Sequence, residues 1–312
     1  MAQDDCTPVK LTSADFASTT SSDSSVASEH KKWRFHDGKF KNALGQWLYY
    51  CSYFPPQDPD GTRLRGVVVF LHGIGEYARR FTHLFDVLCA SGFGVVAYDL
   101  IGHGRSDDDE CGERAHAQQF QHFVDDTNTF LKLVKQSVFP QMLQGPVPPL
   151  VLMGMSYGSL VGLHTVLSEQ HAFAAVVLAA PALSVEWTTV LRFQRAVLTP
   201  VARFMPRARV TPGVNYAFLS RNPEFLQDYM ADPMVIKGKL TVRMATETLA
   251  AMEKVQHDAQ VVDGESAFCR MPLLLVQGSE DKITSVALAD EFYQRVASKD
   301  KTFQKFDGLY HC

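Results

Sequence analysis

Residues 149–158, Pro-Leu-Val-Leu-Met-Gly-Met-Ser-Tyr-Gly, decide the fold of this chain. The first five are an apolar run that predicts a buried strand, and a helical pattern follows from 157 to 170. Ser156 lies between the two, with a glycine two residues to either side. Because strand and helix approach closely at such a junction, glycine is the residue type that fits the flanking positions. The stretch predicts a sharp strand–turn–helix junction whose serine hydroxyl is exposed above the edge of a sheet.

Apolar runs and helical patterns alternate along most of the chain. The runs that predict buried strands lie at 67–71, 95–98, 150–153, 175–179, 273–276 and 303–306. The helical patterns lie at 78–91, 118–135, 157–170 and 285–297. Such alternation is typical of an α/β fold, in which helices cover both faces of a mostly parallel sheet. Residues 33–54 are expected to add an antiparallel hairpin at the sheet edge.

Two segments lie outside this alternation. Residues 1–32 are rich in Ser, Thr and Asp and have few large apolar residues, so we expect a disordered tail. Residues 184–265 show a mostly helical pattern that prolines interrupt, with a helix break expected at Pro200. We expect this segment to be a helical insertion between two parts of one sheet domain, 33–183 and 266–312.

The composition limits the classes of function. The chain has 312 residues, 46% of them hydrophobic, which is enough for a sizeable globular core. Its net charge of −4 gives no overall attraction to nucleic acid. The sequence shows neither an apolar run long enough to span a membrane nor a secretory signal, so we expect a cytoplasmic protein. The six cysteines have no pairing pattern and are interpreted as free thiols, none of them a metal ligand.

Ser156 is the candidate nucleophile, and it needs partners. A serine hydroxyl reacts well only when a base takes its proton, and the base needs an acid that holds its tautomer. In this kind of fold the acid and then the histidine follow the serine along the chain. His311 is the histidine that comes after the last long helical pattern, and Asp281 lies in the loop after the strand predicted at 273–276. Glu280 is the nearby competitor of Asp281.

Other residues near these motifs have alternative interpretations. Asp307 is nearer to His311 in sequence than Asp281, but it ends a predicted strand instead of lying on a loop that faces the serine. His72 is expected to hold its own loop by hydrogen bonds, and His103 is expected to be structural too. The chain has no H-E-x-x-H, phosphate-loop or dinucleotide pattern, and we expect no metal or organic cofactor.

The reaction also needs hydrogen-bond donors for a negatively charged oxygen. One is expected to be the backbone N–H of Tyr157, which follows the serine at a helix N-terminus. The second is expected from the loop after the first parallel strand, residues 72–76, where the N–H of Ile74 is the best candidate. These two groups would form an oxyanion hole.

Taken together, these residues resemble the monoacylglycerol lipase and lysophospholipase-like branch of the α/β-hydrolases. The matching pieces are 72–76, 99–106, 154–158, 278–281 and Tyr310–His311, with Asp232-Pro233 and 237–239 in the insertion. The likeness runs from about residue 35 to the end. It implies a lid domain over a buried apolar acyl channel, and hydrolysis of ester bonds in single-chain glycerolipids.

The chain departs from this family at its end. Members continue past the histidine with a final helix, whereas this sequence stops at Cys312. We expect an incomplete gene model, a fragment or a splice form. The alternatives to a monoacylglycerol-cleaving serine hydrolase are a short-chain carboxylesterase or acyltransferase with the same site, and a catalytically inactive scaffold.

The segment from Trp187 to Arg209 is the candidate contact with a membrane. Between Trp187 and Pro223 there are six arginines and no acidic residue, interleaved with large apolar residues. One interpretation is an amphipathic lid that touches an anionic membrane surface and admits lipid. The other is a helix packed on the core, with arginine stems that cover its rim.

Overall fold

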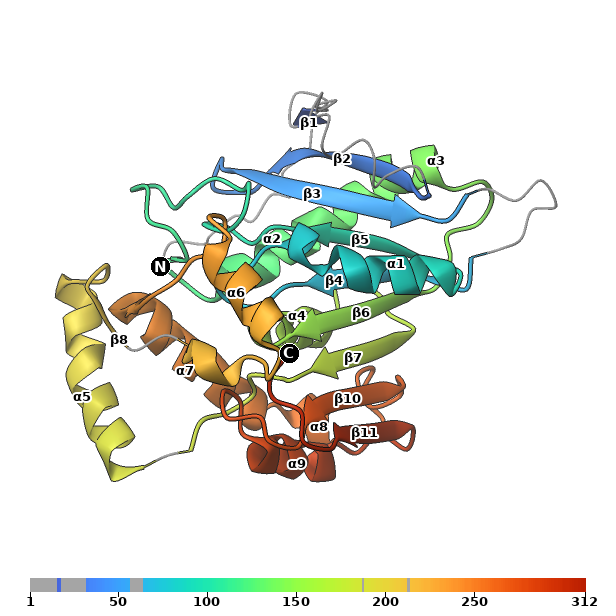
Figure 1. Ribbon diagram of the computed structural model, residues 1–312. Coiled ribbons are helices and arrows are strands. Elements are labelled where there is room, and N and C mark those ends of the chain that lie inside the picture. Colours follow the sequence, from blue (N-terminus) through green and yellow to red (C-terminus); the bar gives the residue numbers. More distant parts are fainter. Residues whose placement is uncertain (1–15, 18–31, 57–63, 187, 212–213) are drawn as a thin grey trace, which may run out of the picture.

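The computed structural model describes residues 16–17, 32–56, 64–186, 188–211 and 214–312. Within them one large sheet has nine strands in the order β1-β2-β3-β5-β4-β6-β7-β10-β11 (Figure 1). Their bounds are Phe16–Ala17, Arg34–Lys41, Trp47–Phe54, Phe93–Tyr98, Gly66–Leu71, Leu150–Met155, Ala175–Ala179, Leu273–Gly278 and Lys301–Phe306, in the same order. The pairs from β5 to β11 are all parallel, and the hairpin of β2 and β3 joins β5 in antiparallel register. The predicted α/β fold is confirmed.

Helices cover both faces of this sheet, which explains the continuous apolar runs of its strands. Along β4, Val67, Val69 and Leu71 pack in the core on the side of α2 (Gln121–Leu133) and α4 (Tyr157–Leu167). Val68 and Phe70 alternate with them and pack on the side of α1 (Thr82–Ala90). Both sets are almost completely buried, so β4 has no polar face.

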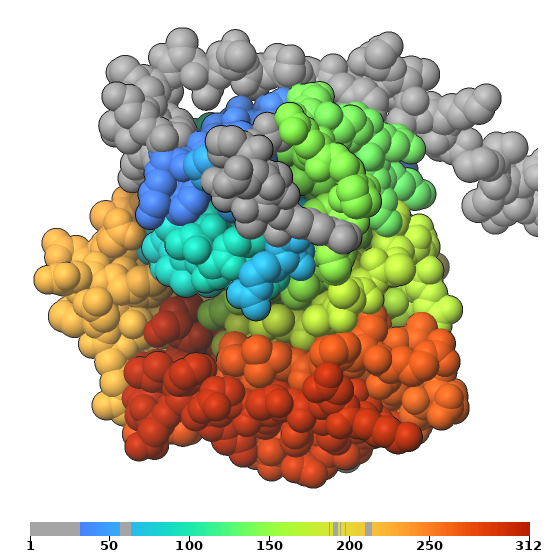
Figure 2. Space-filling view, turned by 90° about the vertical axis from the view of Figure 1, so that its right-hand side faces the viewer, coloured from blue at the N-terminus to red at the C-terminus, as the bar shows by residue number. Residues whose placement is uncertain are grey.

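The remaining elements outside the insertion are short or lie toward the C-terminus. They are η3 (Ala78–Phe81), η4 (Val134–Val138), α3 (Phe139–Met142) and α9 (Val286–Arg295). In the space-filling view the N-terminal hairpin, in blue, and the C-terminal strands with α9, in orange and red, lie at opposite ends of the molecule (Figure 2). The parallel strands between them carry the functional loops at their carboxyl ends.

The N-terminal segment differs from the expectation at one point. Most of the tail predicted at 1–32 lies outside the described residues. Phe16–Ala17, however, form the strand β1, which pairs in antiparallel register with Lys39 and Phe40 of β2. The strand β2 lies at the edge of the hairpin, where its backbone groups are open to pairing, so two residues of otherwise polar sequence can add to the sheet.

Between β7 and β10 the chain forms mostly helices. They are α5 (Thr189–Phe204), η5 (Tyr216–Phe218), α6 (Pro223–Ala231), α7 (Val242–Gln256) and α8 (Ala259–Val262), with the short strands β8 (Arg209–Thr211) and β9 (Leu240–Thr241). The expected break at Pro200 is wrong, because α5 continues through Pro200 for another turn. A proline removes one helical hydrogen bond, and on the exposed side of a long helix this cost does not end it. Figure 1 shows α5 on the outside of the molecule.

We expect a pH-dependent stability from Asp126 on α2. The residue is only 3% exposed, and burial raises its pKa to about 8 although a hydrogen bond from Asn42 opposes this. The folded protein keeps a proton that the unfolded chain releases near its ordinary pKa of about 4, so stability falls as the pH rises between these values. The variant Asp126→Asn should lose this slope. The difference in melting temperature, Asp126→Asn minus wild type, should increase as the pH rises from about 5 to about 8.

The neighbouring Asp125 provides the matched control, because it lies on the same helix and is exposed. The charge of Asp125 is the smallest contribution to the raised pKa of Asp126, so Asp125→Asn should keep most of the wild-type pH dependence in the same thermal denaturation experiment. Equal slopes for wild type and Asp126→Asn would contradict the argument.

Candidate active site

Ser156 occupies a strained turn between β6 and α4. Its backbone has φ 53° and ψ −115°, a left-handed conformation that serine rarely adopts. A Cβ on Gly158 would overlap the carbonyl oxygen of Leu71, and one on Gly154 would overlap the backbone of Gly158. Glycine is required at both positions because α4 leaves β6 across the end of β4. The predicted elbow is therefore present, and Ser156 is 8% exposed at its apex.

Backbone hydrogen bonds fix this turn from three sides. The N–H of Ser156 donates to the carbonyl of Ala179 over 2.8 Å, and its carbonyl accepts from the N–H of Ala182 over 3.3 Å. The hydroxyl of Ser159 donates to the carbonyl of Gly154 over 2.6 Å. Strain of this kind persists only where the surroundings determine the conformation. Here β7, the residues that follow it and the first turn of α4 supply those contacts.

Asp281 and His311 form a buried pair at the same edge of the sheet. Nδ1 of His311 lies 2.8 Å from Oδ2 of Asp281, and the two side chains are 4% and 0% exposed. The hydroxyl of Thr284 lies 2.7 Å from the same oxygen, and the N–H groups of Ile283 and Thr284 donate to Oδ1. Burial alone would raise the pKa of Asp281, but the hydrogen bonds and charge of His311, together with Thr284, lower it to about 2. Asp281 is thus ionised at neutral pH.

The two competing acids lie elsewhere. Glu280 is half exposed and pairs with Arg221. Asp307 is exposed and accepts a hydrogen bond from the hydroxyl of Ser279 over 3.3 Å. The structure therefore brings Asp281, and neither of these neighbours, to His311.

Ser156 and the Asp281–His311 pair are linked through the ends of neighbouring strands. The hydroxyl of Thr284 lies 3.2 Å from the carbonyl of Ala180, which follows the residue that accepts the Ser156 N–H. Within the described residues no hydrogen bond joins the Ser156 hydroxyl to His311. In ligand-free enzymes such bonds are often long, and they tighten when substrate binds.

The two backbone donors predicted for an oxyanion also lie at this edge. The N–H of Tyr157 is in the first turn of α4, and that of Ile74 lies in the tight turn that the Glu76 N–H closes on the carbonyl of Gly73 over 3.2 Å. Neither donates to another group in the described part of the chain. Gly73 lies beside Ser156, since a Cβ on it would be 3.5 Å from the Cβ of Ser156.

The two histidines expected to be structural hold loops. His72 lies 2.8 Å from the carbonyl of Gly73 through Nδ1, and its Nε2 accepts from the N–H of Leu100 over 2.9 Å. Burial, and then the nearby His103, lower the pKa of His72 to about 3. His103 is buried as well and contacts the carbonyl of Ile101 over 2.8 Å. Neutral His72 therefore fixes the start of the loop 72–76.

The sequence reasoning assigned no role to two further residues of the site, Glu76 and Thr284. Glu76 is 6% exposed, and one of its carboxyl oxygens would lie 2.7 Å from a Cβ on Gly73. Burial raises the pKa of Glu76 to about 7, against the opposing charges of His311 and Arg80. The position of Glu76 within the motif 72–76 could have indicated that it belongs to the site. Thr284 is recognised only from its contacts with Asp281.

The fold and the site together define a serine hydrolase of the α/β-hydrolase class. The site features are a strained serine at a strand–helix elbow, a buried aspartate–histidine pair and two backbone N–H groups. Among the described residues no group of three or more His, Cys, Asp or Glu side chains could hold a metal ion. Residues 62–312 match the family described as Serine aminopeptidase, S33. The chain belongs to this family.

Known relatives agree with this assignment. The chain is 30% identical to a monoacylglycerol lipase of Mycolicibacterium smegmatis over 293 residues, which are 92% of this chain and 91% of the relative. It is 28% identical to a monoglyceride lipase of Homo sapiens over 270 residues, 86% and 81% of the two chains. The crystal structure of Paleococcus ferrophilus monoacylglycerol lipase superposes on this protein with a TM-score of 0.68 and 26% sequence identity. The superposition covers 85% of this chain and 90% of the lipase chain. The predicted family resemblance is confirmed, and the chain is a serine ester hydrolase.

We expect the elbow to fail when Gly158 gains a methyl group. In Gly158→Ala the new Cβ meets the backbone of β4, which cannot move aside cheaply. The variant should lose about 1–3 kcal/mol of stability and most of its esterase activity. Gly264→Ala is the control, because a Cβ there would be no closer than 3.8 Å to its neighbours. Denaturant unfolding and ester hydrolysis measure both, and an active, stable Gly158→Ala protein would contradict this account of the turn.

Proposed function

We propose that this protein hydrolyses the ester bond of monoacylglycerols through an acyl-enzyme on Ser156. The observation that carries the proposal is the buried hydrogen bond of 2.8 Å between His311 and ionised Asp281, at the sheet edge that also holds the strained serine. The names of the relatives support the substrate class, since two of them are a monoacylglycerol lipase and a monoglyceride lipase.

The first half of the reaction forms the acyl-enzyme. The Ser156 oxygen attacks the ester carbonyl carbon while Nε2 of His311 accepts the hydroxyl proton, and the carbonyl oxygen becomes an anion. The N–H groups of Ile74 and Tyr157 donate hydrogen bonds to that anion. Asp281 stabilises the positive charge that develops on His311. The carbon–oxygen bond to the glycerol then breaks, and His311 returns the proton to the leaving alkoxide.

The second half releases the fatty acid. Water enters, His311 takes one of its protons, and the resulting hydroxide attacks the acyl carbonyl of the Ser156 ester. The same two N–H groups hold the anion again. When the intermediate collapses, His311 gives the proton to the Ser156 oxygen, and the carboxylic acid leaves.

We expect the identity of the catalytic acid to be decided by two neighbouring variants. Asp281→Asn should lower kcat for a monoacylglycerol by about 10⁴-fold, because the amide no longer stabilises the imidazolium or its required tautomer. Glu280→Gln changes an exposed side chain and should stay within about 2-fold of wild type. Ser156→Ala should abolish hydrolysis and labelling by a fluorophosphonate. Fatty-acid release, measured by titration, checks all three, and a fully active Ser156→Ala protein would refute the proposal.

The outer face of α5 supports a second proposal, contact with a lipid surface. Phe193 and Phe204 are 71% and 81% exposed. They are eleven residues apart in α5, which is about three helical turns, so both side chains lie on the same side of the helix. Exposed Ala196 and Pro200 lie between them at helical spacing, and Met205 follows with 62% exposure. Large apolar side chains collected on one side of a surface helix are typical of an interfacial helix. No helix among the described residues has the length and apolar character needed to cross a bilayer.

The arginines contribute less to this surface than the sequence indicated. Arg195, Arg207, Arg209 and Arg221 each pair with an acidic side chain from another part of the chain. Their charges are therefore largely compensated. The proposed membrane contact of the segment Trp187–Arg209 rests on the apolar face of α5 instead, while Trp187 itself lies outside the described residues.

We expect the double variant Phe193→Ser/Phe204→Ser to bind phosphatidylcholine vesicles at least about 10-fold more weakly than wild type, since burial of each ring contributes roughly 1.5–3 kcal/mol. Hydrolysis of a monoacylglycerol below its solubility limit should be unchanged. Val87→Ser is the control, because Val87 is 63% exposed on α1, away from this face. Vesicle sedimentation measures binding, and an unchanged affinity of the double variant would exclude α5 as the contact.

A further inference from the structure

The loop that carries Ile74 is bonded directly to the helical insertion. The N–H of Ile236 donates to the carbonyl of Gly75 over 2.8 Å. The two backbones are so close that a Cβ on Gly75 would lie 2.6 Å from the carbonyl oxygen of Ile236. The carbonyl that is fixed belongs to the residue that follows the proposed oxyanion donor.

Asp232 makes a second attachment through its side chain. Its Oδ2 accepts a hydrogen bond from the hydroxyl of Tyr77 over 2.8 Å and one from Nη1 of Arg80 over 3.0 Å. The side chains of Asp232 and Arg80 are only 14% and 8% exposed, so water weakens this ion pair little. Tyr77 directly follows the turn that presents Ile74, and Asp232 caps the end of α6.

Arg80 joins the insertion to the residue beneath the loop. Its guanidinium lies 4.7 Å from the ring centre of Tyr229 and 5.4 Å from that of Phe225, both on α6. Its Nε lies 4.0 Å from Oε1 of Glu76, whose other carboxyl oxygen is beside Gly73. One buried cation therefore contacts both the helix of the insertion and the floor of the oxyanion loop.

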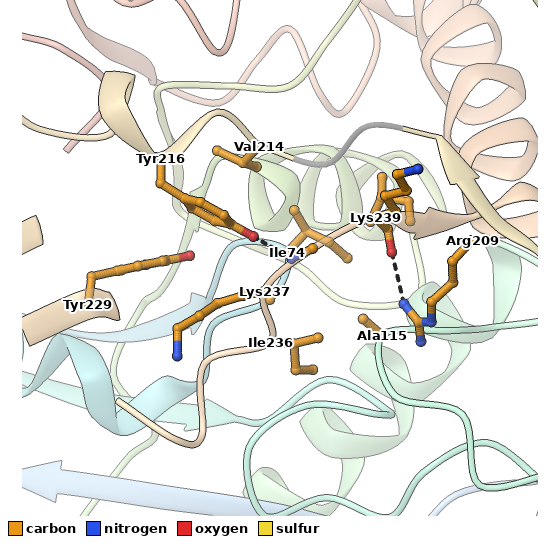
Figure 3. Close-up of a pocket in the computed structure, with 12 residues that line it drawn as sticks. Ile74, Ala115, Arg209, Val214, Tyr216, Tyr229, Ile236, Lys237 and Lys239 are labelled. Carbon is orange, nitrogen blue, oxygen red and sulfur yellow. Dashed lines mark hydrogen bonds between the residues drawn. The ribbon is translucent and has the colours of Figure 1, made fainter. Parts of the chain in front are cut away.

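The space between the two parts is almost filled. Ile74 and Gly75 line a cavity of about 20 Å³ together with Tyr216, Tyr229 and Ile236 of the insertion. This volume holds about one water molecule. Figure 3 shows the side chain of Ile74 among those of the insertion. Tyr216 lines the cavity, and its hydroxyl accepts a hydrogen bond from the N–H of Gly238 over 2.6 Å. The loop has little room to move while the insertion stays in place.

We propose that segment 225–236 of the insertion positions the oxyanion loop, with Asp232 and Arg80 as positioning residues for the Ile74 N–H. This inference rests on the proposed function, because it takes Ile74 as a donor to the reacting oxygen. An oxyanion donor acts only when it points at the place where charge develops, and a displacement of about 1 Å removes much of its effect. The insertion is in this view a part of the catalytic apparatus as well as a cover.

The test asks whether two variants of this protein lose stabilisation of the transition state while they keep their affinity for the substrate. Asp232→Ala removes the acceptor of Tyr77 and one of the two carboxylates that pair with Nη atoms of Arg80, the other being Asp228. Tyr77→Phe removes one hydroxyl. We expect Asp232→Ala to lower kcat about 10- to 100-fold with KM within about 2-fold, and Tyr77→Phe to give a smaller change in the same direction. Asp232→Asn keeps an oxygen acceptor and should recover most of the loss.

Two ligands separate positioning from general damage. An alkylboronic acid forms a tetrahedral adduct on Ser156, whereas a 1-O-alkylglycerol ether binds without reacting. Asp232→Ala should weaken boronate binding by the factor lost in kcat and leave ether binding unchanged. Glu253→Gln is the control, because it removes the Arg195 salt bridge inside the insertion without touching the oxyanion loop.

Each outcome is decisive. Parallel losses of boronate and ether affinity, or unchanged kcat in both Asp232→Ala and Tyr77→Phe, would overturn the inference. If Asp232→Ala fails to fold by circular dichroism, the single-hydroxyl change in Tyr77→Phe decides the question alone. A wild-type protein that hydrolyses no monoacylglycerol would instead defeat the proposed function, so the two failures are distinguishable.

Discussion

The close approach of β4, β6 and α4 is the constraint on which the site depends. Because Gly158 lies against the carbonyl of Leu71, α4 must begin directly above the end of β4. This geometry forces Ser156 into a left-handed backbone conformation and leaves the first N–H groups of α4 unpaired in the helix. The same contact therefore places the hydroxyl at the apex of the turn, supplies one proposed oxyanion donor and places Ser156 beside the loop that carries the other. A looser junction would lose all three properties together.

Electrostatics adds a requirement that packing alone does not meet. A carboxylate as buried as Asp281 is costly to ionise, yet it must be charged to stabilise a protonated His311. The structure resolves this conflict with donors from four residues, His311, Thr284, Ile283 and Gln277. Among them His311 and Thr284 lower the pKa of Asp281 to about 2. Glu76 has the backbone of Gly73 as a donor, and burial raises its pKa to about 7 against this hydrogen bond and the charges of His311 and Arg80. Two carboxyl groups near one imidazole thus differ in pKa, because Asp281 has more hydrogen-bond donors to offset its burial than Glu76 has.

The sequence predicted those features that local patterns encode. Apolar runs predicted the parallel strands, and the spacing of Gly154, Ser156 and Gly158 predicted the elbow. Loop position favoured Asp281 over Asp307, but Glu280 lies in the same loop and remained a competitor. The contact of Asp281 with His311 came only from the structure. The helix break at Pro200 was wrong, because a local preference was outweighed by a long helix. The attachment of Asp232 to Tyr77 and Arg80 could not be predicted, because no periodicity links residues about 150 positions apart.

The two proposed roles of the insertion, contact with a lipid surface and positioning of the loop 72–76, belong to different helices. The exposed apolar face lies on α5, which is bonded to α7 through Arg195 and Glu253. The contacts with the oxyanion loop come from α6 and the residues that follow it, up to Ile236. Since neither set of side chains contributes to the other, the proposed contact with a lipid surface and the proposed positioning of the Ile74 N–H can change independently. Under these proposals the sequence of α5 can vary as long as its outer face stays apolar, whereas the inner segment must keep its position against the loop 72–76.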